Sequence, residues 1–171
     1  IYGYNTISIN KKYFAYSSHF SVFLYDISTF QFSESICQGD CRISNIILSK
    51  TNPDEIAILF SNGLLTIYNM LERTQKLNVN IPCKKNYHYL SMEFNPDGTE
   101  LLIFIKDIYT FIDVNLQQGK YKELVIPSIE TVSVYRQHPD LANISILATE
   151  GSRIYVYNTE KIVSKSASFS N

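Results

Sequence analysis

Three short segments that contain a Pro-Asp pair are the first candidates for chemistry in this sequence. They are Asn52-Pro53-Asp54, Asn95-Pro96-Asp97-Gly98 and His138-Pro139-Asp140. A carboxylate in a polar loop can act as a general base or bind a cation. The same residue types also form tight turns, because proline fixes φ near about −65°, aspartate bonds to nearby backbone and glycine accepts a positive φ. Since a catalytic site rarely recurs along a chain, the three copies favour turns.

The spacing of these segments indicates an internal repeat. Pro53, Pro96 and Pro139 follow one another at intervals of 43 residues. A second marker is a strand-like segment that ends in an acid or an amide. The four copies of that marker end at Asp26, Asn69, Asp113 and Asn158, at intervals of 43, 44 and 45 residues. Two of the four are amides, which bind metals less well than carboxylates do, so we expect side-chain capping of a turn rather than a metal site.

The cysteines and histidines show no catalytic or metal-binding signature. Three residues separate Cys37 from Cys41, whereas zinc sites usually contain two closely paired sets of ligands. A mixed zinc site with Cys83 and His88 is the alternative to ordinary thiols, because both segments connect successive repeats. The three histidines fall in different repeats without a local triad signature, and no glycine-rich phosphate loop occurs. We therefore expect no enzyme, no metal and no cofactor.

Composition indicates a globular β protein of nearly neutral charge. The 171 residues are 45% hydrophobic and 18% charged, and they include 13 Tyr and 10 Phe, which favour strands. The net charge of −1 gives no electrostatic footprint for direct binding to nucleic acid or to an anionic membrane. No apolar stretch is long enough to span a bilayer, and the first residues do not resemble a signal peptide. The odd number of cysteines favours a reducing compartment, so we expect an intracellular protein without membrane insertion.

Each repeat is predicted to contain four strands joined by short turns. The repeats cover about 5–38, 42–82, 86–128 and 131–169 within one domain, residues 1–171. The expected strands are 6–10, 12–17, 21–27, 30–37, 43–50, 55–61, 64–70, 74–81, 87–94, 100–106, 108–114, 121–127, 131–137, 143–149, 153–158 and 161–168. A phosphorylatable linker is the alternative for the serine-rich end of the last one.

The second strand of the middle repeats predicts how the sheets are arranged. The strands expected at 55–61 and 100–106 are apolar without alternation, which is typical of strands covered on both faces. Sheets stacked face to face around an axis provide that cover. The predicted fold class is therefore all-β, a β-propeller with about four blades of four antiparallel strands.

These features resemble the blades of WD-repeat propellers. The shared features are a period near 43 residues, a Phe-x-Pro-Asp-Gly turn at 94–98 before an apolar strand, and a third strand that ends in an aromatic residue and an acid. The family's tryptophan before that acid is replaced by Tyr25, Tyr68, Ile112 and Tyr157, and its Gly-His pair is missing. The resemblance covers essentially the whole chain. It implies a blade-type fold in which apolar packing replaces the family's buried hydrogen-bond network.

The resemblance also implies the function that we expect. Rings of this family commonly contain about seven blades. Four blades then need completion by further blades of the same chain, by a second copy or by another subunit. We expect a non-catalytic protein–protein interaction scaffold within a larger intracellular complex. A propeller enzyme or a small-molecule binder that uses the central channel is the alternative, and an RNA-associated scaffold subunit is a weaker one.

The loops that join successive blades are the predicted partner-binding surface. They span 38–42, 84–88 and 128–130. Within them, Arg42, Lys84, Lys85 and Tyr87 carry the kinds of side chain that anchor interfaces or pair with acidic partners. Ordinary solvated loops are the alternative interpretation of these segments.

Overall fold

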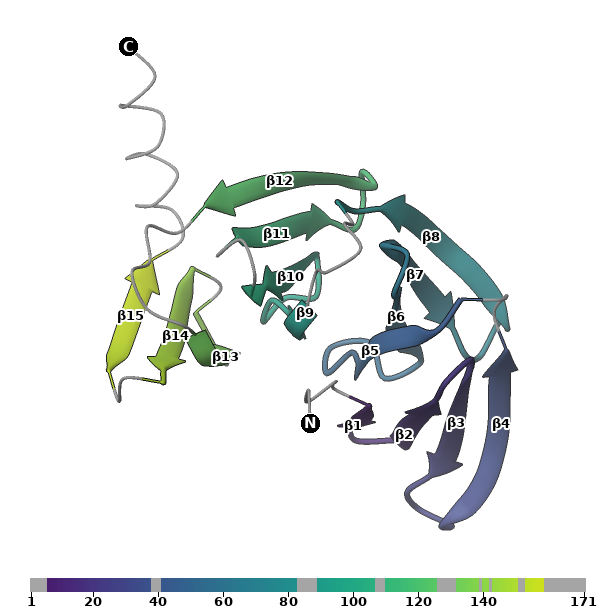
Figure 1. Cartoon of the computed structure of the whole chain (residues 1–171). Coiled ribbons are helices and arrows are strands. Elements are labelled where there is room, and N and C mark those ends of the chain that lie inside the picture. The colour runs from purple at the N-terminus through teal and green to yellow at the C-terminus, as the bar shows by residue number, and fades with distance from the viewer. Residues whose placement is uncertain are drawn as a thin grey trace.

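The described part of the chain folds into fifteen β-strands and contains no α-helix (Figure 1). In this computed structural model the described residues are 6–37, 41–82, 89–106, 110–125, 132–138, 140–141, 143–150 and 153–158. The strands form four separate antiparallel sheets in chain order, which we number sheets 1 to 4. The prediction of an all-β fold is confirmed.

The bounds of the strands follow the expected repeats. Sheet 1 consists of β1 (Ile7–Ile9), β2 (Tyr13–Ser18), β3 (Ser21–Asp26) and β4 (Gln31–Cys37). Sheet 2 consists of β5 (Ile43–Leu48), β6 (Glu55–Phe60), β7 (Leu64–Asn69) and β8 (Thr74–Asn80). Sheet 3 consists of β9 (Tyr89–Phe94), β10 (Glu100–Ile105), β11 (Thr110–Asn115) and β12 (Lys120–Val125). Sheet 4 consists of β13 (Val132–Gln137), β14 (Ile144–Thr149) and β15 (Ile154–Asn158). The strand expected at 161–168 lies outside the described residues.

The repeat is visible in a detail of strand register as well as in strand order. The first strands β5, β9 and β13 each carry one extra residue where they pair with the second strand of their sheet. The extra residues are Ser44, Leu90 and Ser133. A bulge bends its strand and increases the local twist. The first strands of sheets 2, 3 and 4 therefore bend at corresponding positions.

The sheets are arranged as a fan with their first strands on the inside. Figure 1 shows an arc in which β1, β5, β9 and β13 lie toward the centre and β4, β8 and β12 run along the outside. The first strands of successive sheets contact one another, β1 with β5, β5 with β9 and β9 with β13. This is the blade-like arrangement that the repeat predicted, seen here as an arc of four sheets.

The hydrophobic core lies between the sheets. We call the face of a sheet that points toward the next sheet along the chain its forward face, and the opposite one its rear face. Three clusters fill the spaces between sheets 1 and 2, 2 and 3, and 3 and 4. The forward residue Leu24 packs in the first cluster with the rear residue Ile58, and the forward residue Leu59 packs in the second with the rear residue Ile103. Burying one such side chain stabilises the fold by about 1.5–3 kcal/mol.

Candidate functional site

Only one of the predicted partner-binding residues falls in the part of the chain that the structure describes. Arg42 is exposed at the start of sheet 2, and its backbone carbonyl accepts a hydrogen bond from the Ser61 N–H at 2.8 Å. Cys41 beside it is a half-buried free thiol at the edge of the cluster between sheets 1 and 2. The other predicted residues, Lys84, Lys85 and Tyr87, lie outside the described residues, as do 38–40 and 128–130. Partner binding by these loops stays a prediction.

The turn between first and second strands is capped by the residue at its start in all four sheets. Asn10 Oδ1 accepts the backbone N–H groups of Lys12 and Tyr13 at 2.9 and 2.8 Å. The corresponding acceptors in sheets 2, 3 and 4 are Asn52 for Asp54 at 3.4 Å, Asn95 for Glu100 at 2.9 Å, and His138 Nδ1 for Asp140 and Leu141, both at 3.1 Å. In sheets 2, 3 and 4 the repeated Asn or His before the proline was the available signal for this role, whereas no proline follows Asn10. Pro139 lies outside the described residues.

The two described aspartates that follow the prolines of sheets 2 and 3 have different partners. Asp97 accepts hydrogen bonds from the backbone and the hydroxyl of Thr99 at 2.9 and 2.6 Å. These bonds, the hydroxyl first, lower the pKa of the Asp97 carboxyl. Asp54 instead accepts a hydrogen bond from Lys12 of sheet 1, whose Nζ lies 2.6 Å from Asp54 Oδ1. That hydrogen bond is the main cause that raises the pKa of Lys12.

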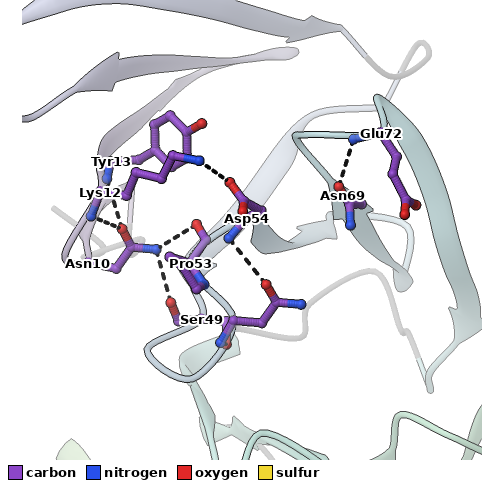
Figure 2. Close-up of polar contacts among 9 residues, drawn as sticks. Asn10, Lys12, Tyr13, Ser49, Pro53, Asp54, Asn69 and Glu72 are labelled. Atoms are coloured by element: carbon purple, nitrogen blue, oxygen red, sulfur yellow. Dashed lines mark hydrogen bonds and ion pairs between the residues drawn. The ribbon is translucent and has the colours of Figure 1, made fainter.

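The first turns also join neighbouring sheets. Figure 2 shows the Asn10 amide of sheet 1 pointing into the turn of sheet 2, where its Nδ2 donates to the carbonyls of Ser49 and Pro53 at 2.9 and 3.0 Å. Between sheets 2 and 3, Gly98 packs against Thr51, and a Cβ added at Gly98 would lie 2.2 Å from Thr51 Oγ1. Gly98 also has a φ of +76°, which favours glycine. The Pro-Asp turns are thus contact points between blades.

The residue that ends the third strand caps the following turn. Asp26 Oδ1 accepts the N–H groups of Ser28 and Thr29 at 2.8 and 3.0 Å, and Asn69 accepts that of Glu72 at 2.8 Å. Figure 2 shows the second of these caps. Asn158 ends β15, and the residues after it lie outside the described ones.

Sheet 3 places this cap two residues later than the repeat spacing suggested. Asn115 accepts the N–H groups of Gln117 and Gln118 at 3.1 and 2.9 Å. Asp113 lies inside β11, and its carboxylate is 2.9 Å from Lys122 Nζ on the neighbouring strand. The nearly constant spacing of the repeat predicted the cap at Asp113, and this prediction is wrong. A cap must lie at the end of the strand, where the backbone N–H groups of the turn are available to its side chain.

A groove lies where the first strands of sheets 2, 3 and 4 end. Its volume is 120 Å³, and it is lined by Ile47, Leu48, Lys50, Thr51, Glu93, Phe94, Asn95, Pro96, Gln137 and His138. The apolar residues and Pro96 form walls, while Lys50, Glu93 and His138 bring charge and hydrogen-bonding groups to the same place. No short motif marks this groove in the sequence, because its residues come from three different repeats.

Glu93 supplies the carboxyl of the groove. Burial raises its pKa, and this effect is opposed by Arg136, by the backbone N–H of Gln137 and by Lys50. Arg136 Nη1 lies 3.4 Å from Glu93 Oε1. A half-desolvated carboxyl of this kind can hydrogen-bond a small polar ligand. Within the described residues no group of three or more His, Cys, Asp or Glu side chains could hold a metal ion.

The rear face of sheet 1 is apolar and exposed. Two rows of side chains cross it, one of Ile7, Tyr16 and Phe23, the other of Ile9, Phe14, Tyr25 and Phe32. The exposed fraction is 63% for Ile7, 62% for Ile9 and 54% for Phe32. Beside the second row is a hollow of 340 Å³, lined by Ile9, Phe14, Tyr16, Tyr25, Asp26, Ile27 and Phe30. No other described element covers this aromatic surface.

The forward face of sheet 4 is also apolar and exposed, but it is aliphatic. Cross-strand pairing places Val134, Ala148 and Ile154 in one row, with Ile146 and Val156 beside them. The exposed fractions are 47% for Val134, 41% for Ile146, 73% for Ile154 and 68% for Val156. The two end faces of the arc therefore have the composition of an interior and the exposure of a surface.

Comparison with models of known protein families and with curated proteins finds no match to this chain. Within the part of the chain that the structure describes, no helix is long and apolar enough to cross a membrane.

Proposed function

We propose that this chain is part of a non-catalytic protein-binding scaffold of the β-propeller type, similar to WD-repeat propellers. The single observation that supports this most is the pair of bare apolar faces at the two ends of the arc. We still expect the protein to act as a subunit of a larger intracellular complex. The segments that join successive sheets remain its proposed partner-binding surface, with Arg42 as the described member.

Exposure of both end faces is unfavourable for an isolated arc. Side chains such as Ile154 and Phe32, which are 73% and 54% exposed, would each gain about 1–2 kcal/mol from complete burial, in proportion to the area that is still exposed. Contiguous apolar patches on proteins mark interfaces, whereas single exposed apolar residues are ordinary. Further sheets stacked on the two ends would bury these faces in the way that sheets 2 and 3 are buried now. The sheets could come from the same chain, from a second copy or from another subunit.

The mass and the unfolding behaviour of the purified chain test this proposal. We expect light scattering to show species larger than the 19.7 kDa chain, or a monomer that unfolds without a cooperative transition. A monomer of 19.7 kDa that melts in one cooperative step would contradict the proposal, because such a monomer would not need further sheets. Lys substitutions at the end faces should raise solubility if those faces are the cause of association.

A second candidate is a small-ligand site in the groove at the ends of the first strands. The observation that favours it is the convergence of Lys50, Glu93 and His138 beside an apolar wall. Screening a fragment library by ligand-observed NMR would test it, with the Glu93→Gln variant as the control. Fragments that bind the chain and lose binding in this variant would support the site. A library without any hit, or with hits unaffected by Glu93→Gln, would contradict it.

A further inference from the structure

The sheets stack in the same direction at all three internal interfaces. A forward face always packs against a rear face, as Leu24 does with Ile58 between sheets 1 and 2 and as Phe104 does with Tyr135 between sheets 3 and 4. The rings of Phe104 and Tyr135 lie 6.0 Å apart between centroids. The sheets share one strand order, and sheets 2, 3 and 4 also share one bulge position, so that similar sheets dock in the same way along the chain.

One of the two bare faces is a forward face and the other is a rear face, and both are apolar. The end of the arc at sheet 4 offers a forward face, and the end at sheet 1 offers a rear face. The forward face projects branched aliphatic side chains, foremost Ile154 and Val156. The rear face offers stacked aromatic rings, with Tyr16 and Phe23 5.0 Å apart, beside an apolar hollow of 340 Å³. Aliphatic side chains fitted into an aromatic surface form a close-packed interior.

Charge does not oppose this contact. The two rows of side chains on the rear face of sheet 1 include no charged residue, and Asp26, which lines the hollow, accepts the N–H groups of Ser28 and Thr29 with its carboxylate. On the forward face of sheet 4 the charged residue is Arg136, which is already paired with Glu93 of sheet 3. Burial of the two faces against each other would therefore not leave a charge buried without a partner. An unpaired buried charge carries a large desolvation cost.

We propose that the forward face of sheet 4 binds the rear face of sheet 1 of a second copy of this chain, head to tail. The inference rests on the proposed scaffold function and names the occupant of its end faces. A second copy uses both bare faces and pairs a forward face with a rear face, as the three internal interfaces do. Such a heterologous contact closes into a ring when the rotation between copies permits it.

Two pairs of charge substitutions isolate the two faces. Ile9→Lys with Phe32→Lys blocks the rear face of sheet 1, and Ile154→Lys with Val156→Lys blocks the forward face of sheet 4. All four positions are exposed in the single chain, so the lysines stay solvated and the fold is retained. The control pair is Leu71→Lys with Val125→Lys, which have exposed fractions of 71% and 60% and lie away from both faces.

Sedimentation equilibrium of these proteins gives the decisive result. We expect the wild type and the control pair to have at least twice the 19.7 kDa mass of the chain, and each blocked variant to be a monomer. An equal mixture of the two blocked variants should form a 1:1 dimer, because it contains one intact face of each kind. Circular dichroism of each variant checks that the sheets remain folded.

Three results would overturn the inference, and they separate it from the scaffold function. Association that survives in either blocked variant means that a different surface joins the copies. Blocked variants that stay monomeric when mixed mean that the forward face of sheet 4 and the rear face of sheet 1 do not bind each other. In both cases end faces or other surfaces still assemble the protein, and the scaffold function stands. A wild-type monomer excludes the second copy, and it contradicts the scaffold function as well only if it melts in one cooperative step.

Discussion

The middle sheets and the end sheets carry the same strand in two different environments. The second strands β6 and β10 of sheets 2 and 3 are buried at five of their six residues, on both faces. The corresponding β14 of sheet 4 is buried only at alternate residues, and β2 of sheet 1 only at Ala15. Since strand length and pairing are alike, the difference comes from the number of neighbouring sheets. Burial in this fold is set by position in the stack, and the end sheets resemble blades with one neighbour missing.

The largest expected effect is the contrast between a middle and an end isoleucine. Ile103→Ala should lower the free energy of unfolding by about 3 kcal/mol, because it leaves a cavity in the fully buried cluster between sheets 2 and 3. Ile154→Ala on the bare face of sheet 4 should lower it by less than about 0.5 kcal/mol. Urea denaturation at a protein concentration low enough to separate the copies measures both, because Ile154 is bare only in the single chain. Equal losses would show that the end face is as well packed as the interior.

The next contrast is between two glycines with positive φ. Gly98→Ala should cost about 2 kcal/mol, because strain at its φ of +76° adds to a collision with Thr51 of the neighbouring sheet. Gly119→Ala, at a φ of +64°, should cost about 1 kcal/mol, because its added Cβ meets only the movable Cδ1 of Leu77, at 3.0 Å. Combining Gly98→Ala with Thr51→Ala should recover part of the loss. A double variant no more stable than Gly98→Ala would rule out the collision.

Polar contacts between sheets should have a smaller effect than packing does. Asn10→Ala removes the two hydrogen bonds to Ser49 and Pro53 of sheet 2 together with two within its own turn. We expect a loss of about 1.5 kcal/mol in the free energy of unfolding. The matched control is Asn62→Ala, which removes one bond to the Leu64 N–H within a turn of sheet 2 and should cost about 0.5 kcal/mol. Equal costs would mean that the contacts of Asn10 with sheet 2 contribute nothing.

The smallest effects are opposite responses to pH at two carboxyls of sheet 3. Burial raises the pKa of Glu93, so its contribution to stability is present at low pH and is lost as the pH rises through the raised pKa. Hydrogen bonds from Thr99 lower the pKa of Asp97, so its contribution is present above the usual pKa and is lost as the pH falls through the lowered one.

Melting temperatures between pH 3 and pH 8 test both signs. Relative to wild type, Glu93→Gln should gain stability as the pH rises above the usual pKa of a glutamate, and Asp97→Asn should lose stability as the pH rises through the lowered pKa of Asp97. A Glu93→Gln variant that becomes less stable than wild type toward neutral pH would show that the pairing with Arg136 outweighs burial.

Much of the fold could be predicted from the sequence because its signals are local. Apolar runs mark the strands, and Pro, Asp and Gly mark the turns, so each of the fifteen described strands begins and ends within two residues of its expected bounds. The caps at Asn10 and Asn95 also lie in local turn sequences, but the prediction for these turns rested on proline and aspartate and did not include them. The groove around Glu93 could not be predicted, because it depends on how three repeats stack. The cap at Asn115 was missed because strand ends shift within a repeat of constant length.

The central claim is that both ends of the arc are covered in the assembled protein, and hydroxyl-radical footprinting of the native assembly tests it most directly. The side chains of Phe32 and Ile154 are exposed in the single chain, as is that of Leu71 in a turn of sheet 2. We predict that Phe32 and Ile154 are protected several-fold in the assembly, while Leu71 is labelled as strongly as its exposure allows. Equal labelling of all three would contradict the account, because the end faces would then meet only water.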